Sequence, residues 1–391
     1  MHIALLRMQA GSPGGAEATL EHLARGLAAA GHQVTVYGAG SSHAGAKSLG
    51  AEVTFAPVPV WGGKTLRLLS FAANTRRLLH KAPVDVVLSL ERTFFQQVYR
   101  AGDGCHREWL ARRSPSLSRG KKLGQTFSPF HRVMLWLEKR TFTSPALKRV
   151  IANSRQVKEE VSRHFRLHPD MVRLIYNGLD HQVFQPPAAA ERRRQRERLG
   201  ASAEHGIILF AGSGFARKGL KYLVEAFGRL ADKQAHLWVV GKGRAGSCQS
   251  LARQLGVADR VRFWGPQTEM APFYQAADLL ALPTLYDPCS NVVLEALGCG
   301  CPVITSAANG AAEFITPGEN GEVIPQPDDG KVWAGSLDEW LARSRDPRVS
   351  RAAREAVAHL SWEATVSRTL EVLQDAVAFS CREKSSVEEK L

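Results

Sequence analysis

The feature that most restricts how this chain can fold is the repeated alternation of short apolar segments with helix-like segments. An apolar strand at residues 3–6 is followed by a Gly-rich loop, an amphipathic helix that ends near Ala30, and a second strand at residues 32–38. This order is that of a parallel β-α-β unit. Further strands of the first half are expected at residues 51–56, 84–90, 149–154 and 172–178. The first half is therefore predicted to form a doubly wound α/β sheet.

A second series of the same kind begins after residues 181–203. This segment has a Pro pair and a highly charged helix that is predicted to be solvated, and it is expected to link two domains. Helical segments again separate the strands, so the second half is predicted to be another parallel α/β domain of Rossmann type. The strands of this series are expected at residues 206–213, 235–243, 261–265, 279–284 and 302–306.

These patterns give the domain boundaries. Residues 1–180 are predicted to form the first domain and residues 204–360 the second. A last helix at residues 361–379 is capped by Ser361 and is expected to pack back on the first domain. Residues 380–391 are polar and are expected to be disordered.

The composition is that of a globular protein of about two domains. The chain has 391 residues, of which 44% are hydrophobic and 23% are charged, and no run approaches the roughly 18 apolar residues of a membrane-spanning helix. The first residues do not resemble a signal peptide, so a cytoplasmic location is expected. The six cysteines lack CxxC spacing, which suits a reducing compartment. Neither an Asp-x-Asp triplet nor a metal-ligand cluster occurs, so no metal and no cofactor are predicted.

The excess of positive over negative charge lies entirely in the first half of the chain. Residues 1–185 hold 26 Lys and Arg against 12 Asp and Glu, whereas the remaining residues hold 25 of each. The excess is densest between Arg107 and Arg149. A basic field of this kind implies an anionic partner, which could be nucleic acid, acidic lipid or a phosphorylated substrate.

Basic and apolar side chains alternate closely enough in this half to rest on an anionic membrane surface. The candidate segment is Lys64–Lys81, and a basic helix that covers the sheet is its alternative and favoured interpretation. The aromatic residues that would join it are Trp109, Phe127, Phe130 and Trp136.

The segment 282–304 carries the clearest chemical signal. Asp287 lies in a loop and Glu295 lies eight positions later, on the first turns of a helix that Ser290 or Asn291 can cap. A helix N-terminus attracts a diphosphate, while acids on either side are better suited to accept hydrogen bonds from sugar hydroxyls. A ligand with phosphate in its middle and hydroxyl-rich ends is a nucleotide sugar. The alternative is an ordinary loop and helix whose acids are solvated.

Two cations in the same half fit this ligand. Arg217 and Lys218 precede a helix expected to start at Gly219, and together they can offset the charge that grows on a departing nucleoside diphosphate. Gly212 and Gly241 lie at the carboxyl ends of two predicted strands, where ligands of open α/β sheets bind. The alternative for the two cations is a solvated basic turn.

The first half offers weaker candidates. The loop Gly11–Gly15 opens a helix as phosphate-binding turns do, but it is not GxGxxG, and no acid ends the second strand. A nicotinamide cofactor is therefore disfavoured, and a tight turn is the alternative. Asp103 and His106 lie in a segment predicted to be irregular, where they are either site residues or ordinary polar surface residues.

Together these motifs resemble glycosyltransferase family 4, the retaining transferases of the GT-B fold. The resemblance covers residues 1 to about 379 and is carried by motifs in the family's order. Among its subgroups the chain looks most like the lipopolysaccharide core glucosyltransferases, through AGDGC and GFARKG. The matching motifs are PGGAE, VIANSRQVKEEV, IYNGLD, GSGFARKGLKYLVEAF, VVGKG and VVLEALGCGCPVIT.

The resemblance implies two facing Rossmann-like domains with an interdomain cleft. Arg217 and Lys218 would hold the donor diphosphate, Glu295 the ribose hydroxyls, and Asp287 the donor sugar. One departure is that the family usually has Glu at the position of Asp287. Further residues implied at the site are Gly14 and Gly15 from the first domain, Asp103 or His106 beside the transferred sugar, and the backbone N–H groups of Cys289, Ser290, Asn291 and Val292.

The expected activity is transfer of a hexose from a nucleotide sugar, such as UDP-glucose, to an anionic glycan or glycolipid such as lipopolysaccharide core. The reaction would be retaining and independent of metal. A nucleotide-sugar epimerase of the same fold and a non-catalytic nucleotide-sugar binding protein are the alternatives. An anionic membrane surface is a possible partner of the basic first domain, and nucleic acid is not expected, because it would leave the acid pair unexplained.

Overall fold

Some predicted segments fall outside the part of the chain that this computed structural model describes. They are residues 10–13 of the Gly-rich loop, residue 203 of the expected link, and residues 389–391 of the expected tail. The described residues are 1–9, 14–40, 49–202 and 204–388.

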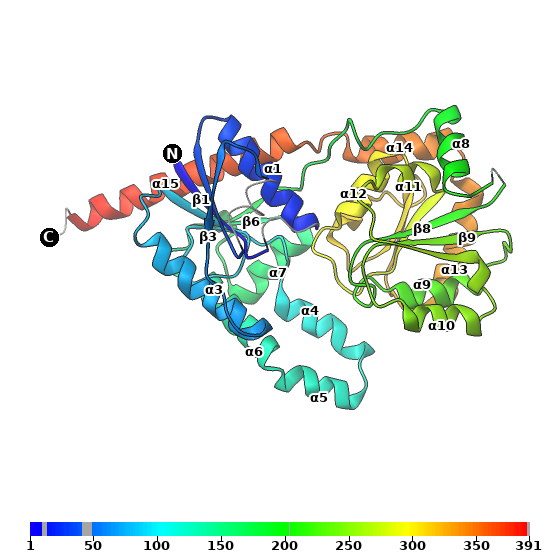
Figure 1. Cartoon of the computed structure of the whole chain (residues 1–391), viewed down its shortest axis with the longest axis horizontal. Coiled ribbons are helices and arrows are strands. Elements are labelled where there is room, and N and C mark those ends of the chain that lie inside the picture. Colours follow the sequence, from blue (N-terminus) through cyan, green and yellow to red (C-terminus); the bar gives the residue numbers. More distant parts are fainter. Residues whose placement is uncertain (10–13, 41–48, 203, 389–391) are drawn as a thin grey trace. The chain divides into compact units, whose positions relative to one another are not determined.

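The chain divides into two compact units. Unit 1 consists of Met1–Gly178 and Trp362–Leu391, and unit 2 of Leu179–Ser361. Each unit contains one parallel β-sheet with helices packed against it (Figure 1). The predicted α/β class with two Rossmann-like domains is confirmed.

The sheet of unit 1 has the strand order β3-β2-β1-β4-β5-β6-β7, and all neighbours run parallel. The chain adds β2 and β3 on one side of β1 and then β4 to β7 on its other side. The point between β1 and β4, where the direction of the connections changes, is the switch point of the sheet. The strands are β1 (His2–Leu6), β2 (Gln33–Gly38), β3 (Val53–Pro57), β4 (Val86–Ser89), β5 (Val98–Arg100), β6 (Arg149–Ala152) and β7 (Val172–Leu174).

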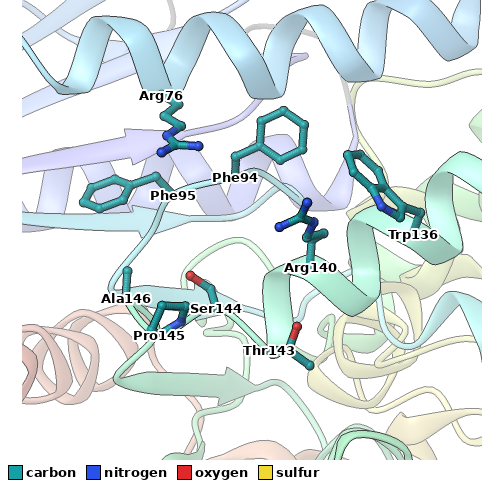
Figure 2. A pocket seen from close by; sticks show the side chains of 9 residues that line it. All are labelled: Arg76, Phe94, Phe95, Trp136, Arg140, Thr143, Ser144, Pro145 and Ala146. Carbon is teal, nitrogen blue, oxygen red and sulfur yellow. The ribbon is translucent and has the colours of Figure 1, made fainter.

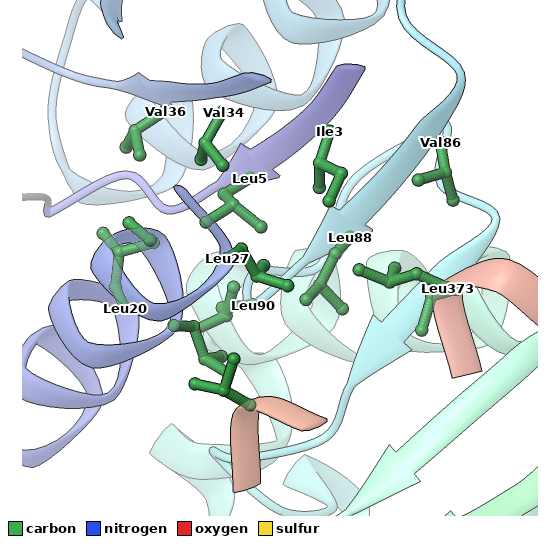
Figure 3. Packing of buried hydrophobic residues seen from close by; sticks show 14 of the residues in the cluster. Ile3, Leu5, Leu20, Leu27, Val34, Val36, Val86, Leu88, Leu90 and Leu373 are labelled. Atoms are coloured by element: carbon green, nitrogen blue, oxygen red, sulfur yellow. The ribbon is translucent and has the colours of Figure 1, made fainter. Parts of the chain in front are cut away.

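Alternate residues of the central strands fill the cores on the two faces of this sheet, as the period of two in a strand requires. Ile3 and Leu5 of β1 pack with α1 and α15 on one face (Figure 3), whereas Ala4 and Leu6 pack with Phe71 of α3 on the other. The helices of unit 1 are α1 (Gly15–Ala29), α3 (Lys64–Leu79), α4 (His106–Arg113), α5 (Arg119–Phe127), α6 (Pro129–Phe142), α7 (Arg155–Phe165) and α15 (Trp362–Glu388).

The sheet of unit 2 has the order β10-β9-β8-β11-β12-β13, again with parallel neighbours. This is the doubly wound order of Rossmann folds, and its switch point lies between β8 and β11. The strands are β8 (Ile207–Ala211), β9 (His236–Val240), β10 (Val261–Gly265), β11 (Leu279–Leu282), β12 (Val303–Ser306) and β13 (Gly321–Ile324).

Two layers of helices enclose this sheet (Figure 1). Contacts join α9 to α10 and α13 in one layer, and join α8, α11, α12 and α14 in the other. The helices are α8 (Ala189–Arg198), α9 (Leu220–Phe227), α10 (Gly246–Gln254), α11 (Ala271–Ala276), α12 (Asn291–Gly298), α13 (Gly330–Arg343) and α14 (Pro347–Val357).

The expected link between the domains is part of unit 2, because its helix α8 packs there. Arg196, predicted to be solvated, is only 5% exposed. Its Nη1 lies 3.1 Å from Asp278 Oδ2, and Arg192 Nη2 lies 2.7 Å from Asp278 Oδ1. The description of this helix as solvated is therefore wrong, since charge pairing anchors one of its faces.

The last helix is longer than predicted. α15 belongs to unit 1, where Trp362 stacks on His22 of α1 with ring centroids 4.1 Å apart. It continues to Glu388, so the expected disorder is wrong for residues 380–388. The polar composition misled the prediction, because these residues include neither Gly nor Pro and can extend an existing helix.

Several helices and strands of the structure were not predicted from the sequence. The short strands β5 and β13 were not predicted, nor were α4, α5, α6, α13 and α14. β5 has three residues and β13 four, too few for a clear periodic pattern. Among the described residues, no helix combines the length and apolar character needed to cross a bilayer.

Replacing Asp278 tests the anchoring of α8. We expect Asp278→Ala to lower the free energy of unfolding by roughly 3–5 kcal/mol, because it leaves the buried Arg196 without its counter-charge. Urea unfolding monitored by tryptophan fluorescence measures the change. Glu339→Ala, which removes the exposed partner of Arg343, should cost about 1 kcal/mol or less. Equal losses in the two variants would contradict the anchoring role.

Candidate functional site

The predicted donor residues of unit 2 gather at its switch point. Arg217 and Lys218 lie in the loop after β8, and Asp287 lies in the loop after β11, the neighbouring strand. Because parallel strands end at one edge of the sheet, these two loops meet although 70 residues separate Arg217 from Asp287. Open α/β sheets bind their ligands at this place.

Asp287 holds both cations. Its Oδ2 lies 3.0 Å from Lys218 Nζ and 3.2 Å from Arg217 Nη1, which also donates to the carbonyl oxygen of Tyr286 at 2.9 Å. Asp287 and Lys218 are both buried. Burial alone would raise the pKa of Asp287, but Lys218 and Arg217 outweigh it and the pKa is lowered. The cluster of Asp287, Lys218 and Arg217 therefore carries one negative and two positive charges.

Glycines make room for this cluster. A Cβ on Gly212 would lie 2.7 Å from Lys218 Cε, and Gly212 has a φ of 125°, a value that favours glycine. A Cβ on Gly241 would lie 2.1 Å from the carbonyl oxygen of Gly212. Gly212 and Gly241, the two glycines predicted as ligand contacts, thus allow the ends of β8 and β9 to approach each other closely. They also leave room for the aliphatic part of the Lys218 side chain.

The start of α12 faces the same cluster. Ser290 is its N-cap, as predicted, but the hydroxyl makes no capping bond and instead accepts a hydrogen bond from Lys218 Nζ at 3.0 Å. The Ser290 N–H donates to Asn309 Oδ1 at 3.3 Å. Cys289 is buried beside it, whereas Asn291 and Val292 are partly exposed. The helix start is therefore tied directly to one of the two cations.

Glu295 lies on α12 and points to a partner that the sequence analysis missed. Its Oε2 accepts a hydrogen bond from the Tyr274 hydroxyl at 2.7 Å. Burial raises the pKa of Glu295, although the Tyr274 hydrogen bond and the charge of Lys218 oppose the shift. Tyr274 comes from α11, and no spacing rule connects it with Glu295 in the sequence.

Unit 1 has a charged cluster at its own switch point. Arg7, directly after β1, contacts Glu17 of α1, Glu91 after β4, and Asp103 after β5, at 3.1, 3.7 and 2.8 Å. Arg7 and Glu91 were missed, although each follows a predicted strand directly, which is the signal that could have found them. Asp103 is 37% exposed at its side chain. The predicted residue Asp103 thus belongs to a cluster of one cation and three carboxylates.

His106 has a different environment from Asp103. It begins α4, which replaces the irregular segment that was predicted, and its Nε2 lies 3.1 Å from His131 Nδ1. Burial, with Arg92 and then His131 nearby, lowers the pKa of His106 to about 3. The imidazole is therefore neutral at pH 7. Its backbone N–H donates to Glu138 Oε1 at 2.6 Å, which fixes the start of α4.

Gly14 and Gly15 open α1 beside the Arg7 cluster. Both are exposed, and a Cβ on Gly14 would lie 2.3 Å from Glu17 Oε2. The structure thus brings Gly14, Gly15 and Asp103 near Arg7 in unit 1, and the donor candidates together in unit 2. Within the described ranges, no group of three or more His, Cys, Asp or Glu side chains is arranged to hold a metal.

Each half of the chain matches a family model of known proteins. Residues 13–183 match the model of "Glycosyltransferase Family 4", and residues 205–343 match that of "Glycosyl transferases group 1". The chain is a family 4/group 1 glycosyltransferase. Its predicted membership of this family is therefore confirmed, and with it the general class of enzyme.

Individual relatives agree with this assignment. The lipopolysaccharide glucosyltransferase WaaG of Escherichia coli (strain K12) is 27% identical over 80% of this chain and 82% of that protein. A D-inositol 3-phosphate glycosyltransferase of Xylanimonas cellulosilytica is 32% identical over 58% of this chain, which corresponds to 57% of the relative.

Solved structures establish the GT-B fold. The crystal structure of WaaG superposes with a TM-score of 0.81 at 23% identity and covers 95% of this chain and 99% of that one. Anabaena HepE in complex with UDP-glucose gives 0.73 at 20% identity and covers 96% and 100% of the two chains. The arrangement of strands in both units is thus shared with this fold.

The partly buried environment of Glu295 predicts a pH-dependent stability. Its raised pKa means that burial disfavours the ionised carboxylate. This lowers the free energy of unfolding at pH 7, and the loss disappears below about pH 4.5, the pKa of the carboxyl in the unfolded chain. Glu295→Gln keeps an oxygen for the Tyr274 hydroxyl without the charge. We expect this variant to unfold with a higher free energy than the wild type at pH 7, and the difference to shrink as the pH falls to 5.

Chemical denaturation at several pH values measures this difference. Glu319→Gln removes an exposed carboxyl of the same unit and serves as the matched control, with no expected gain. A Glu295→Gln variant that is less stable at pH 7, or equally altered at all pH values, would contradict the assignment of a burial cost.

Proposed function

We propose that the protein transfers a hexose from a nucleotide-diphosphate sugar of the UDP-glucose class to an anionic glycan or glycolipid acceptor. The observation that carries the proposal is the cluster of Arg217, Lys218 and Asp287 at the unit 2 switch point, with Glu295 close by on α12. The solved complex of HepE with UDP-glucose supports a donor of this class.

The cations of the cluster retain hydrogen-bond donors for a diphosphate. Arg217 uses Nη1 for both of its hydrogen bonds, and among the described residues its Nε and Nη2 have no partner. Its side chain is 36% exposed. Lys218 Nζ has three donors and contacts Asp287 and Ser290. A diphosphate oxygen can therefore join the cluster without displacing Asp287.

These cations suit a reaction in which negative charge grows on a leaving diphosphate. In the proposed retaining step the bond between the anomeric carbon and the diphosphate oxygen breaks while the acceptor hydroxyl attacks from the same face. The acceptor proton passes to the departing phosphate oxygen. Because Arg217 and Lys218 supply the charge stabilisation, we propose a metal-independent reaction, and the assays described below contain EDTA.

The acceptor is proposed to be anionic. The basic excess lies in unit 1, and WaaG, whose name describes a lipopolysaccharide glucosyltransferase, supports a phosphorylated glycolipid such as lipopolysaccharide core. Asp103 is proposed to border the transferred sugar, since Arg7 fixes one of its oxygens and the side chain remains partly exposed. His106, buried and neutral, is a less direct candidate for this role.

A peripheral contact with the inner face of the cytoplasmic membrane is part of this proposal. α5 buries none of its residues, and Leu123 and Phe127 are 60% and 69% exposed on it, beside Arg119, Lys121 and Lys122. Apolar and basic side chains on one exposed helix favour a surface that is both apolar and anionic. α3, by contrast, packs on the sheet through Phe71 and Leu79, in agreement with the favoured interpretation of Lys64–Lys81.

Removing the two cations tests the donor site. We expect Arg217→Ala and Lys218→Ala each to lower turnover about 100- to 1,000-fold, because each removes charge stabilisation of the leaving group. The assay measures nucleoside diphosphate released from UDP-glucose, with circular dichroism as the check on folding. Lys221→Ala, at the exposed second residue of α9, is the matched control and should keep full activity.

The same assay separates the three candidate activities. Slow release of free nucleoside diphosphate from a panel of nucleotide sugars favours a transferase, interconversion of sugars an epimerase, and a thermal shift without turnover a binding protein. Near-normal turnover by the Arg217→Ala/Lys218→Ala double variant would refute the proposed role of the cations.

The membrane contact predicts a dependence on lipid charge. We expect co-sedimentation with vesicles that contain anionic lipid at low salt, and weak binding to neutral vesicles. Leu123→Asp/Phe127→Asp should reduce binding by more than about tenfold, since it removes two apolar groups that would enter the interface. Val332→Asp, at an exposed apolar residue of α13, is the control. Equal binding to neutral and anionic vesicles would remove the membrane proposal.

A further inference from the structure

Unit 1 contains a pocket that belongs to neither switch point. Its volume is about 390 Å³ (Figure 2). α3 contributes Arg76, the segment before β5 contributes Phe94 and Phe95, and the end of α6 contributes Trp136 and Arg140. Residues 143–146, which follow α6, close the remaining side.

The pocket lies toward the amino ends of the strands. Phe95 is three residues before β5, Ala146 is three residues before β6, and Arg76 is near the end of α3, which leads into β4. Asp103, by contrast, follows the carboxyl end of β5. Substrates of open α/β sheets bind at the carboxyl ends. The pocket is therefore separate from the proposed donor and acceptor sites.

Two guanidinium groups reach into this pocket from opposite walls. Figure 2 shows Arg76 extending from α3 toward Phe95 and Arg140 extending from α6 toward the space between Phe94 and Trp136. No acid lines the pocket, and among the described residues neither arginine has an ion-pair partner. Two like charges that face a common space without a carboxylate favour an anion there.

Aromatic side chains form the rest of the wall, and their neighbours hold them in place. Phe94 packs edge-on against Trp136 with ring centroids 5.5 Å apart, and Phe95 packs against His80 at 6.0 Å. Arg140 Cζ lies 5.4 Å from the centroid of the Trp136 ring. The pocket thus combines cations with fixed aromatic surfaces, which bind planar apolar groups.

We propose that this pocket binds a small organic phosphate in which one phosphate group is attached to a planar ring. The guanidinium groups of Arg76 and Arg140 would bind the phosphate, to which arginine is geometrically matched. The ring would pack against Phe94, Phe95 and Trp136. The volume lies within the roughly 300–1,000 Å³ of small-molecule sites. The proposal adds a second ligand site and does not depend on the identity of the sugar donor.

Phenyl phosphate is the simplest probe of this chemistry. Isothermal titration compares it with glycerol 3-phosphate, which has the phosphate without the ring, and benzyl alcohol, which has the ring without the phosphate. We expect phenyl phosphate to bind at least about tenfold more tightly than either, a difference of about 1.4 kcal/mol. Equal affinity for phenyl phosphate and glycerol 3-phosphate would overturn the proposal, because the aromatic wall would then contribute nothing.

Each arginine of the pocket has a basic neighbour that serves as a matched control. Arg77 follows Arg76 on α3, and Lys139 precedes Arg140 on α6; all four are exposed, and only Arg76 and Arg140 line the pocket. We expect Arg76→Ala and Arg140→Ala to weaken phenyl phosphate binding about tenfold or more, and Arg77→Ala and Lys139→Ala to change it less than about twofold.

A third variant separates this pocket from the proposed donor site. Arg217→Ala removes phosphate binding at the proposed donor site in unit 2, so the titrations are repeated in this variant, in which the tight binding of phenyl phosphate that depends on Arg76 should remain. Loss of binding in Arg217→Ala with retention in Arg76→Ala would place the anion elsewhere and overturn the proposal. Equal losses in all four basic variants of α3 and α6 would show diffuse charge attraction, which also overturns it.

Discussion

Both units depend on the reversal of strand order beside their first strand. In unit 1, β2 lies on one side of β1 and β4 lies on the other; in unit 2, β9 and β11 lie on the two sides of β8. The loops after β1 and β4, and those after β8 and β11, therefore meet at one edge of each sheet. The interior of a parallel sheet is apolar, and the central strands of both sheets are almost entirely buried. Charged groups brought in by the chain therefore collect at these loop ends, where Arg7 and Glu91 meet in one unit and Lys218 and Asp287 in the other.

The two switch points differ in charge, and this difference is chemically useful. In unit 2, two cations surround Asp287, which leaves a positive balance that suits a diphosphate. In unit 1, three carboxylates surround Arg7, which leaves a negative balance that suits hydroxyl donors. The basic excess of unit 1 is densest elsewhere, along α4–α6. The proposed attraction of an anionic acceptor and the proposed contact with the transferred sugar thus involve different surfaces of the same unit.

The sequence predicted those parts of the site that lie directly at strand ends or helix starts. Arg217, Lys218 and Asp287 each follow a clear strand, so their meeting was foreseeable from the parallel topology. Tyr274 was not, because its contact with Glu295 depends on how α11 packs beside α12. The same holds for the fold: regular α/β units were predicted, whereas α4–α6 were missed because their burial depends on tertiary packing. Glu138, for example, is 1% exposed and binds Arg92 from 46 positions away.

Asp287 stands where the family resemblance implies Glu, and the shorter side chain fits the geometry of the cluster. The backbone of Asp287 is fixed on both sides, because its N–H donates to Ala308 and its carbonyl oxygen accepts from Gly310. From this fixed position the short side chain reaches both cations. Its buried carboxylate is therefore occupied with positioning Arg217 and Lys218. Both cations contact the same oxygen, Oδ2, so the proposed contact with the donor sugar would use Oδ1 or the backbone at the start of α12.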